Sequence, residues 1–291
     1  MNSKCYIFLD RICYLVLFSI IGIWSKVYGQ SSWDYLISKT DDFTLVGLGS
    51  FIVAIVTFTL ACGTLAVVDL LIPKEKTNDI KLQKNKLPTI EDYKGSLPLV
   101  LFNFIIVSLL FNFPVLYFLH PSSPFNKADN VSLYSKLPSW PEIIINVILC
   151  VICEEVFFYY IHRLFHHPKL YSIVHKKHHQ FSAPIGIAAF YMEPSDFALS
   201  NLIPGISGPL IFNVHPVSHY CYLFATLIST IVTHGGYEVP YFPWAARHDF
   251  HHETHHSTFG VLGLMDWIHG TDAPFQRRLV KNNHTRAYLK E

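Results

Sequence analysis

The sequence predicts an all-α integral membrane protein, in which about four transmembrane helices and a hairpin are capped by a cytosolic, histidine-rich, metal-binding helical domain. Hydrophobic residues make up 51% of the 291 residues and charged residues only 15%, against about 25% charged residues in an average soluble domain. Of the 17 histidines, all but His120 lie at or after His162. The net charge of +1 gives no basic field that would favour nucleic acid as a partner.

Four apolar segments are candidate transmembrane helices, because a spanning helix needs roughly 20 apolar residues. They lie near 12–26, 45–72, 97–119 and 143–160. The first has basic residues before a short apolar core, as signal peptides also have, and we expect it to be an uncleaved helix. Two shorter apolar segments within 197–233 are interrupted by proline and glycine. They are predicted to form a hairpin that either crosses the membrane or re-enters it.

These segments divide the chain into an N-terminal transmembrane region at 1–140, a histidine-rich domain at 141–275 and a C-terminal tail at 276–291. The loop at 73–96 holds six lysines and the loop at 28–42 holds one. Because cytosolic loops of membrane proteins are enriched in Lys and Arg, we expect the 73–96 loop to face the cytosol. Counting spans from that loop places all the histidine clusters on the cytosolic face.

Three histidine clusters have the spacing of metal ligands on helices. Residues three or four apart lie on one helix face, so each cluster can direct two imidazoles at one ion. One zinc ion takes four ligands, so eight imidazoles indicate two metal ions. Neutral nitrogen donors suit Zn, Cu, Fe or Ni, and they leave the full metal charge for binding dioxygen. The eight are His162, His166, His175, His178, His179, His248, His251 and His252.

Weaker candidates adjoin these clusters. His234 ends the last apolar segment, where the chain returns to the predicted metal face, and we expect it to be a further ligand. Glu238 follows four residues later, although two glycines between them favour a break in the helix. His167, His255 and His256 each abut a cluster, and we expect one of them to be a ligand or a proton donor.

Acidic residues near the clusters are candidate partners of the imidazoles. Glu154 and Glu155 lie within the fourth apolar segment, where acids are costly and usually functional or paired. We expect them, like Asp249 and Asp266, to accept an N–H from a ligating imidazole. Pairing with Arg163 is the alternative for the two glutamates.

From about Pro141 to Phe275 the sequence resembles the fatty acid hydroxylase superfamily, in its sterol desaturase and C-4 methylsterol oxidase branch. Two further segments, FGVLG at 259–263 and DWIHGTD at 266–272, are most similar to the group called fatty acid hydroxylase domain-containing protein 2. The motifs that carry the main resemblance are EEVFFYYIHRLFHHPKLYSIVHKKHH at 154–179, FSAP at 181–184, HGGY at 234–237 and HDFHH at 248–252.

The resemblance implies a non-haem site of two iron ions, held by the eight clustered histidines and His234. It also implies O2 as co-substrate, an endoplasmic reticulum membrane location, and electrons from NAD(P)H through cytochrome b5 or its reductase. Glu238 stands where relatives often carry His or Asp, and His255 and His256 stand where many carry Phe and Asn. These departures concern the outermost ligands and not the core of the site.

The expected reaction is oxidation of an unactivated C–H bond of a membrane lipid. Resemblance favours C-4 methyl oxidation of a sterol intermediate in sterol biosynthesis, and hydroxylation or desaturation of fatty acyl chains or sphingolipids is the alternative. A membrane metal transporter is a more distant alternative. It would place histidines and acids inside several spans near the membrane midplane, whereas the predicted spans lack histidine and carry acids only near their ends.

Overall fold

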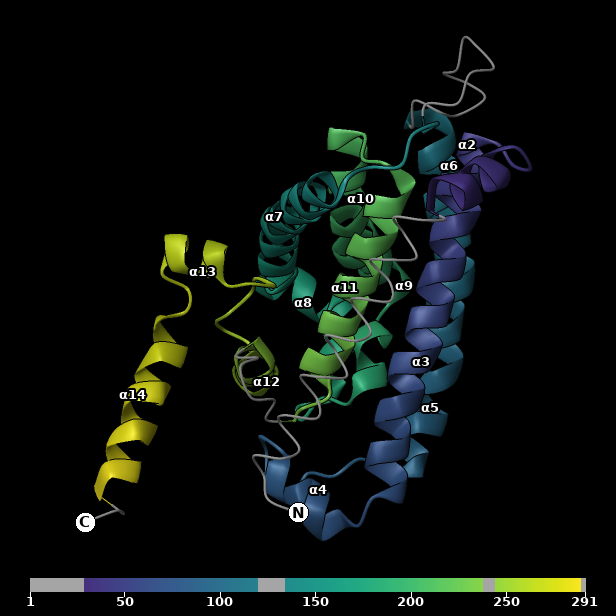
Figure 1. Cartoon of the computed structure of the whole chain (residues 1–291). Coiled ribbons are helices and arrows are strands. Elements are labelled where there is room, and N and C mark those ends of the chain that lie inside the picture. The colour runs from purple at the N-terminus through teal and green to yellow at the C-terminus, as the bar shows by residue number, and fades with distance from the viewer. Residues whose placement is uncertain (1–28, 120–133, 238–243, 289–291) are drawn as a thin grey trace.

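The computed structural model describes residues 29–119, 134–237 and 244–288 (Figure 1). The predicted first span at 12–26 and Glu238 lie outside the described residues. Within the described residues the regular secondary structure is helical, apart from one isolated antiparallel bridge between Lys81 and Tyr237. The predicted all-α class is confirmed.

Among the described residues, three helices are long and apolar enough to cross a membrane, and they match the second, third and fourth predicted spans. Their outward surfaces carry large apolar side chains, such as Leu60, Leu110 and Ile144, which are more than half exposed. Apolar surface of this extent suits contact with lipid. The helices are Asp42–Leu71, made of α2 (Asp42–Thr44), η1 (Leu45–Gly49) and α3 (Ser50–Leu71); Ile90–Leu119, made of α5 (Ile90–Leu101), η2 (Phe102–Val107) and α6 (Ser108–Leu119); and α7 (Trp140–Phe165).

The predicted hairpin consists of η5 (Phe197–Leu202), α10 (Ile203–Phe212) and α11 (Pro216–His234). Asn213 ends α10 in the left-handed conformation, with φ 45°, and Pro216 then begins α11. α10 packs along α7, and α11 packs against both α3 and α7. A Cβ at Gly208 would lie 2.7 Å from Cα of Cys150, so the glycine permits the close approach of α10 to α7.

The short helices of the histidine-rich region lie at the end of the bundle where α7 and α11 finish (Figure 1). The lysine-rich loop at 73–96 packs at the same end of the bundle. The ammonium of its Lys81 donates to the carbonyl of Gly235 at 2.7 Å and lies 3.3 Å from the Asp69 carboxylate. The predicted C-terminal tail is mostly helical. The remaining helices of the lysine-rich loop, the histidine-rich region and the tail are α4 (Lys74–Ile80), α8 (Pro168–Val174), η3 (His178–Gln180), η4 (Gly186–Phe190), α9 (Pro194–Asp196), α12 (Trp244–Thr254), α13 (Leu264–His269) and α14 (Ala273–Tyr288).

Candidate metal centre

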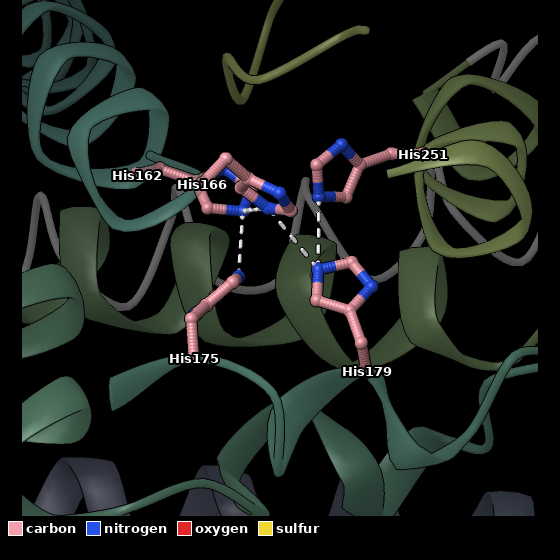
Figure 2. Close-up of side chains that lie close together, drawn as sticks. All are labelled: His162, His166, His175, His179 and His251. Carbon is pink, nitrogen blue, oxygen red and sulfur yellow. Dashed lines mark hydrogen bonds between the residues drawn. The ribbon is translucent and has the colours of Figure 1, made fainter. Parts of the chain in front are cut away.

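Nine histidines from distant parts of the chain converge into two adjacent clusters. In each cluster the candidate ligand atoms all lie within 4.8 Å of one another. The five-histidine cluster is His162, His166, His175, His179 and His251, shown in Figure 2. The four-histidine cluster is His178, His234, His248 and His252. The structure therefore brings together the eight histidines of the spaced clusters and His234, and either cluster is able to hold a metal ion.

Local helix geometry explains how the clusters are assembled. His162 lies in the last turn of α7 and His166 caps that helix, so the two imidazoles lie one turn apart with their rings edge to face. His178 and His179 are neighbours on the 3₁₀ helix η3, where successive side chains diverge by a third of a turn. Each therefore joins a different cluster: His179 lies with His175 in the five-histidine cluster, and His178 lies in the four-histidine cluster.

The same division occurs on α12. His248 and His252 are four residues apart and share the four-histidine cluster, whereas His251 points into the other one. Adjacent positions on an α-helix are about 100° apart, so one short helix contributes ligand atoms to both clusters.

The hydrogen bonds of the imidazoles fix which ring nitrogen faces the centre of each cluster. Nδ1 of His162 lies 2.7 Å from the carbonyl oxygen of Phe259, and Nδ1 of His251 lies 2.8 Å from that of Ser257. A carbonyl only accepts, so these Nδ1 atoms carry the proton. Nε2 of a neutral imidazole is then an acceptor. The same holds in the four-histidine cluster for His234, which donates to Thr230.

Burial keeps the clustered imidazoles neutral. It lowers the pKa of His166 to about 2, and repulsion from neighbouring imidazoles adds to that effect. Burial also places the pKa values of His179, His248 and His252 well below the usual range. Because these imidazoles stay neutral, no added proton forms a hydrogen bond between facing Nε2 atoms. Their lone pairs point toward the centre of each cluster.

The spacing between facing nitrogens fits a shared cation. Nε2 of His162 is 3.0 Å from Nε2 of His175, and Nε2 of His251 is 3.2 Å from that of His179. Two nitrogens bound to one ion at about 2.1 Å, at angles between those of octahedral and tetrahedral geometry, lie roughly 3.0 to 3.4 Å apart. Neutral lone pairs at this separation repel unless a cation lies between them, so the donor set fits a bound metal.

A carboxylate that the sequence patterns did not indicate supports the five-histidine cluster. Asp196 is fully buried in α9 and accepts from Nδ1 of His175 at 2.7 Å. Ser200 donates to its other oxygen at 2.7 Å and holds it in place. A carboxylate behind a ligating imidazole fixes its orientation and raises its basicity. Asp196 is outside every histidine motif, so spacing offered no signal for it.

The four acids that were expected to contact imidazoles do not do so. Glu155 accepts the backbone N–H groups of Leu262 and Met265 at 2.7 and 2.9 Å. Asp266 accepts those of Phe259 and Gly260, both at 2.8 Å. Glu155 and Asp266 thus hold the loop whose backbone carbonyls orient His162 and His251. They act on these imidazoles through the loop and not by the direct contact that was predicted.

The other two acids also have different partners. Asp249 accepts from Gln83, at 3.0 Å, in the lysine-rich loop. Glu154 accepts from Tyr222 and Thr226 and lies near the membrane cavity described below. Neither forms the predicted bond to an imidazole, and Arg163 instead donates to Tyr159.

The surplus histidines lie outside both clusters. His255 packs 4.5 Å from the ring of His179, and its Nδ1 is 3.4 Å from the Tyr171 hydroxyl. His167 is exposed and caps the start of α8, and His256 is exposed too. All three line an outer cleft beside His166, so the structure groups none of them with the candidate ligands.

An inner cavity lies on the other side of the clusters, toward the bundle. It is lined by histidines of both clusters and by Thr230, Phe158 and Met192. Its histidines are His162, His175, His178, His234 and His248. A ligand inside this cavity would contact histidines of both clusters.

The fold and the site together define a helical membrane protein with a pair of histidine clusters suited to metal. A fatty acid hydroxylase model matches residues 147–271. Fatty acid hydroxylase domain-containing protein 2 of Homo sapiens is 32% identical over 285 residues, which cover 92% of this chain and 84% of that protein. Methylsterol monooxygenase 1 of Gallus gallus is 27% identical over 84% of this chain and 83% of that protein.

The chain belongs to the fatty acid hydroxylase family, as its motifs predicted, and it is a membrane oxidoreductase. Fatty acid hydroxylase ahd1 of Mycosarcoma maydis is also similar, at 33% identity over 81% of this chain and 60% of that protein. No solved structure matches the chain.

Proposed function

We propose that the protein is a non-haem diiron oxygenase that oxidises an unactivated C–H bond of a membrane lipid. The observation that carries the proposal is the convergence of nine imidazoles into two adjacent clusters beside a cavity that both clusters line. Nitrogen donors suit iron, and two ions would be held by the nine histidines named above. The bound irons supply the activation of O2.

The residues of the chain itself have three tasks in this reaction. The five- and four-histidine clusters hold the ions in fixed positions, and Asp196 and the loop carbonyls keep their imidazoles oriented. The inner cavity excludes bulk water from the reacting carbon, which protects a reactive centre from side reactions. Its walls position one C–H bond of the lipid against the centre.

The favoured substrate is a sterol intermediate that is oxidised at its C-4 methyl group. Two kinds of relative support this choice: methylsterol monooxygenase 1 of Gallus gallus and methylsterol monooxygenase 2-2 of Arabidopsis thaliana, the latter 28% identical over 87% of this chain. Hydroxylation or desaturation of a fatty acyl chain or sphingolipid is the second candidate, and the similarity to fatty acid hydroxylase ahd1 favours it.

We further propose that the protein lies in the endoplasmic reticulum membrane with its histidine clusters facing the cytosol. The lysine-rich loop supports this orientation, because it packs onto the histidine-rich region through Lys81 and Gly235. Electrons would come from NAD(P)H through cytochrome b5 or its reductase as a separate partner. We also propose the division at 1–140, 141–275 and 276–291 as the domain organisation.

Expression in a yeast strain that lacks its own C-4 methylsterol oxidase tests the substrate. We expect restored growth without added sterol and the disappearance of accumulated 4-methylsterols in the lipid profile. A variant with His178→Ala, expressed to the same level, is the control for metal-dependent activity. If growth is not restored and hydroxylated fatty acids or sphingoid bases rise instead, the sterol assignment is wrong and the second candidate function takes its place.

A further inference from the structure

We propose that Glu154 is a substrate-recognition residue, whose carboxylate accepts a hydrogen bond from a hydroxyl group of the lipid at the entrance to the metal centre. The inference rests on the proposed function, since it assumes that the ligand is a lipid. It adds the chemical feature that the protein selects, which is a hydroxyl group close to the carbon that is oxidised.

A second cavity extends from the inner cavity into the bundle. It is lined mainly by apolar side chains of α3, η2, α6, η5, α10 and α11. The two cavities share three lining residues, Glu154, Asn201 and Thr230. A lipid that enters from the membrane side therefore passes these three residues before it reaches the histidines.

One face of α11 gives the length of this membrane cavity. His219, Leu223, Thr226 and Thr230 line it at helical spacing. The eleven rises of 1.5 Å from His219 to Thr230 span roughly 16 Å. Thr230 is one turn before His234, and its backbone carbonyl accepts a hydrogen bond from Nδ1 of His234 at 2.8 Å. The junction of the two cavities therefore lies directly beside the four-histidine cluster.

Glu154 is the acidic side chain at this junction. It is 8% exposed. The hydroxyls of Tyr222 and Thr226 donate to its oxygens at 2.9 and 2.8 Å. Among the described residues no ion pair includes it. A carboxylate accepts about four hydrogen bonds, so two hydroxyl donors leave capacity for a third donor from the cavity.

Its neighbour Glu155 shows what a purely structural acid looks like in this helix. Glu155 is fully buried, and both oxygens accept backbone N–H groups, of Leu262 and Met265. Glu155 does not line the membrane cavity or the inner cavity. A buried acid within a membrane helix is costly and usually functional. Glu154 accepts from side-chain hydroxyls and, unlike Glu155, does not bind a backbone loop. We therefore place its function in the cavities that it lines.

A hydroxyl bound at Glu154 fixes the depth of the lipid. The carbons next to that hydroxyl would then lie in the inner cavity, which both histidine clusters line, while the rest of the lipid occupies the membrane cavity. A lipid without a hydroxyl group would cover the Glu154 carboxylate and donate no hydrogen bond to it. Hydrogen bonds to charged groups contribute enough to discriminate the two lipids by about 10- to 100-fold in affinity.

Equilibrium binding to the purified full-length protein in lipid nanodiscs tests this inference. The probes are a 4-methylsterol with a free 3-hydroxyl group and its 3-deoxy analogue, each displacing a fluorescent sterol. We expect the wild type to bind the hydroxylated probe about 10- to 100-fold more tightly. Glu154→Leu should reduce this preference to less than threefold, and Glu154→Gln, which keeps one acceptor oxygen, should give an intermediate value.

Two controls separate recognition from misfolding. Glu91→Gln removes an exposed carboxylate of α5, and it should leave the preference unchanged. Thr226→Val removes one donor to Glu154 without removing the carboxylate, and it should retain most of the preference. Metal content and a monodisperse elution profile must match the wild type, and if Glu154→Leu fails to fold, the Glu154→Gln value decides.

The outcomes distinguish this inference from the sterol assignment. If the variants keep the wild-type preference for the hydroxylated sterol, Glu154 does not recognise the hydroxyl and the inference is overturned, while the sterol assignment stands. If neither sterol probe binds the wild type, the sterol assignment fails. The same measurement is then made with a sphingoid base and its 3-deoxy analogue. A hydroxyl preference that depends on Glu154 supports the inference, and its absence overturns it.

Discussion

The two histidine clusters differ in number of imidazoles, in support and in surroundings. The five-histidine cluster has a carboxylate, Asp196, behind one imidazole, and the loop carbonyls of Ser257 and Phe259 behind two others. The four-histidine cluster is supported by backbone carbonyls, of Thr230 and Phe181, within the described residues. The latter cluster provides three of its four histidines to the inner cavity, the former two of its five.

This difference indicates a division of tasks between the two clusters. Five imidazoles with a carboxylate behind one of them provide the stronger metal site, because outer partners raise ligand basicity. Four imidazoles leave more of the ion accessible, and the inner cavity, where the lipid would lie, borders this cluster most closely. The outer cleft borders the five-histidine cluster at His166. The pair is thus asymmetric between its lipid side and its outer side.

The largest expected effect is loss of metal when one imidazole is removed from either cluster. We expect His178→Ala and His251→Ala each to reduce the content from two metal ions per chain to about one. His178→Ala should lose its ion more readily, since three imidazoles remain there and four remain in the other cluster. Metal analysis of the purified variants measures this, and retention of two ions in both variants would reject the ligand assignment.

A smaller effect is expected from the carboxylate behind His175. Asp196→Asn should weaken metal binding at the five-histidine cluster by about 10- to 100-fold, the range found for outer partners of ligating histidines. The four-histidine cluster should be unaffected, so a chelator titration should become clearly biphasic. Asp249→Asn is the matched control, because Asp249 is bound by Gln83 and not by an imidazole. Equal weakening in both variants would contradict the comparison.

The smallest effect is expected from the surplus histidine nearest the five-histidine cluster. His255 lies beside His179 but belongs to neither cluster, so His255→Asn should change metal content by less than a tenth. Asparagine is the suitable replacement because His255 has a positive φ of 64°, which Asn tolerates. A loss of one ion in this variant would show that His255 is a sixth ligand.

Much of the site was predictable because its signals are local in sequence. Histidines four residues apart on a helix lie on one face, and His162 with His166 and His248 with His252 do share a cluster. His234 was found from its place at the end of an apolar helix. The acids were misassigned because a carboxylate reaches several partners, and only the packing of α7 against the loop at 257–265 and α11 selects among them.

By itself, the sequence determined that this is a helical membrane protein with enough clustered imidazoles for two metal ions. Composition and the spacing of histidines along the chain are fixed by the order of the residues and do not depend on how the helices pack. The tertiary structure decided the rest. It decided which cluster His178 and His179 each join and brought Asp196 behind His175, since both depend on how separate helices are rotated and where they meet. It also placed Glu154 at the junction of two cavities and Glu155, one residue later, against a backbone loop, because adjacent side chains on a helix face different neighbours.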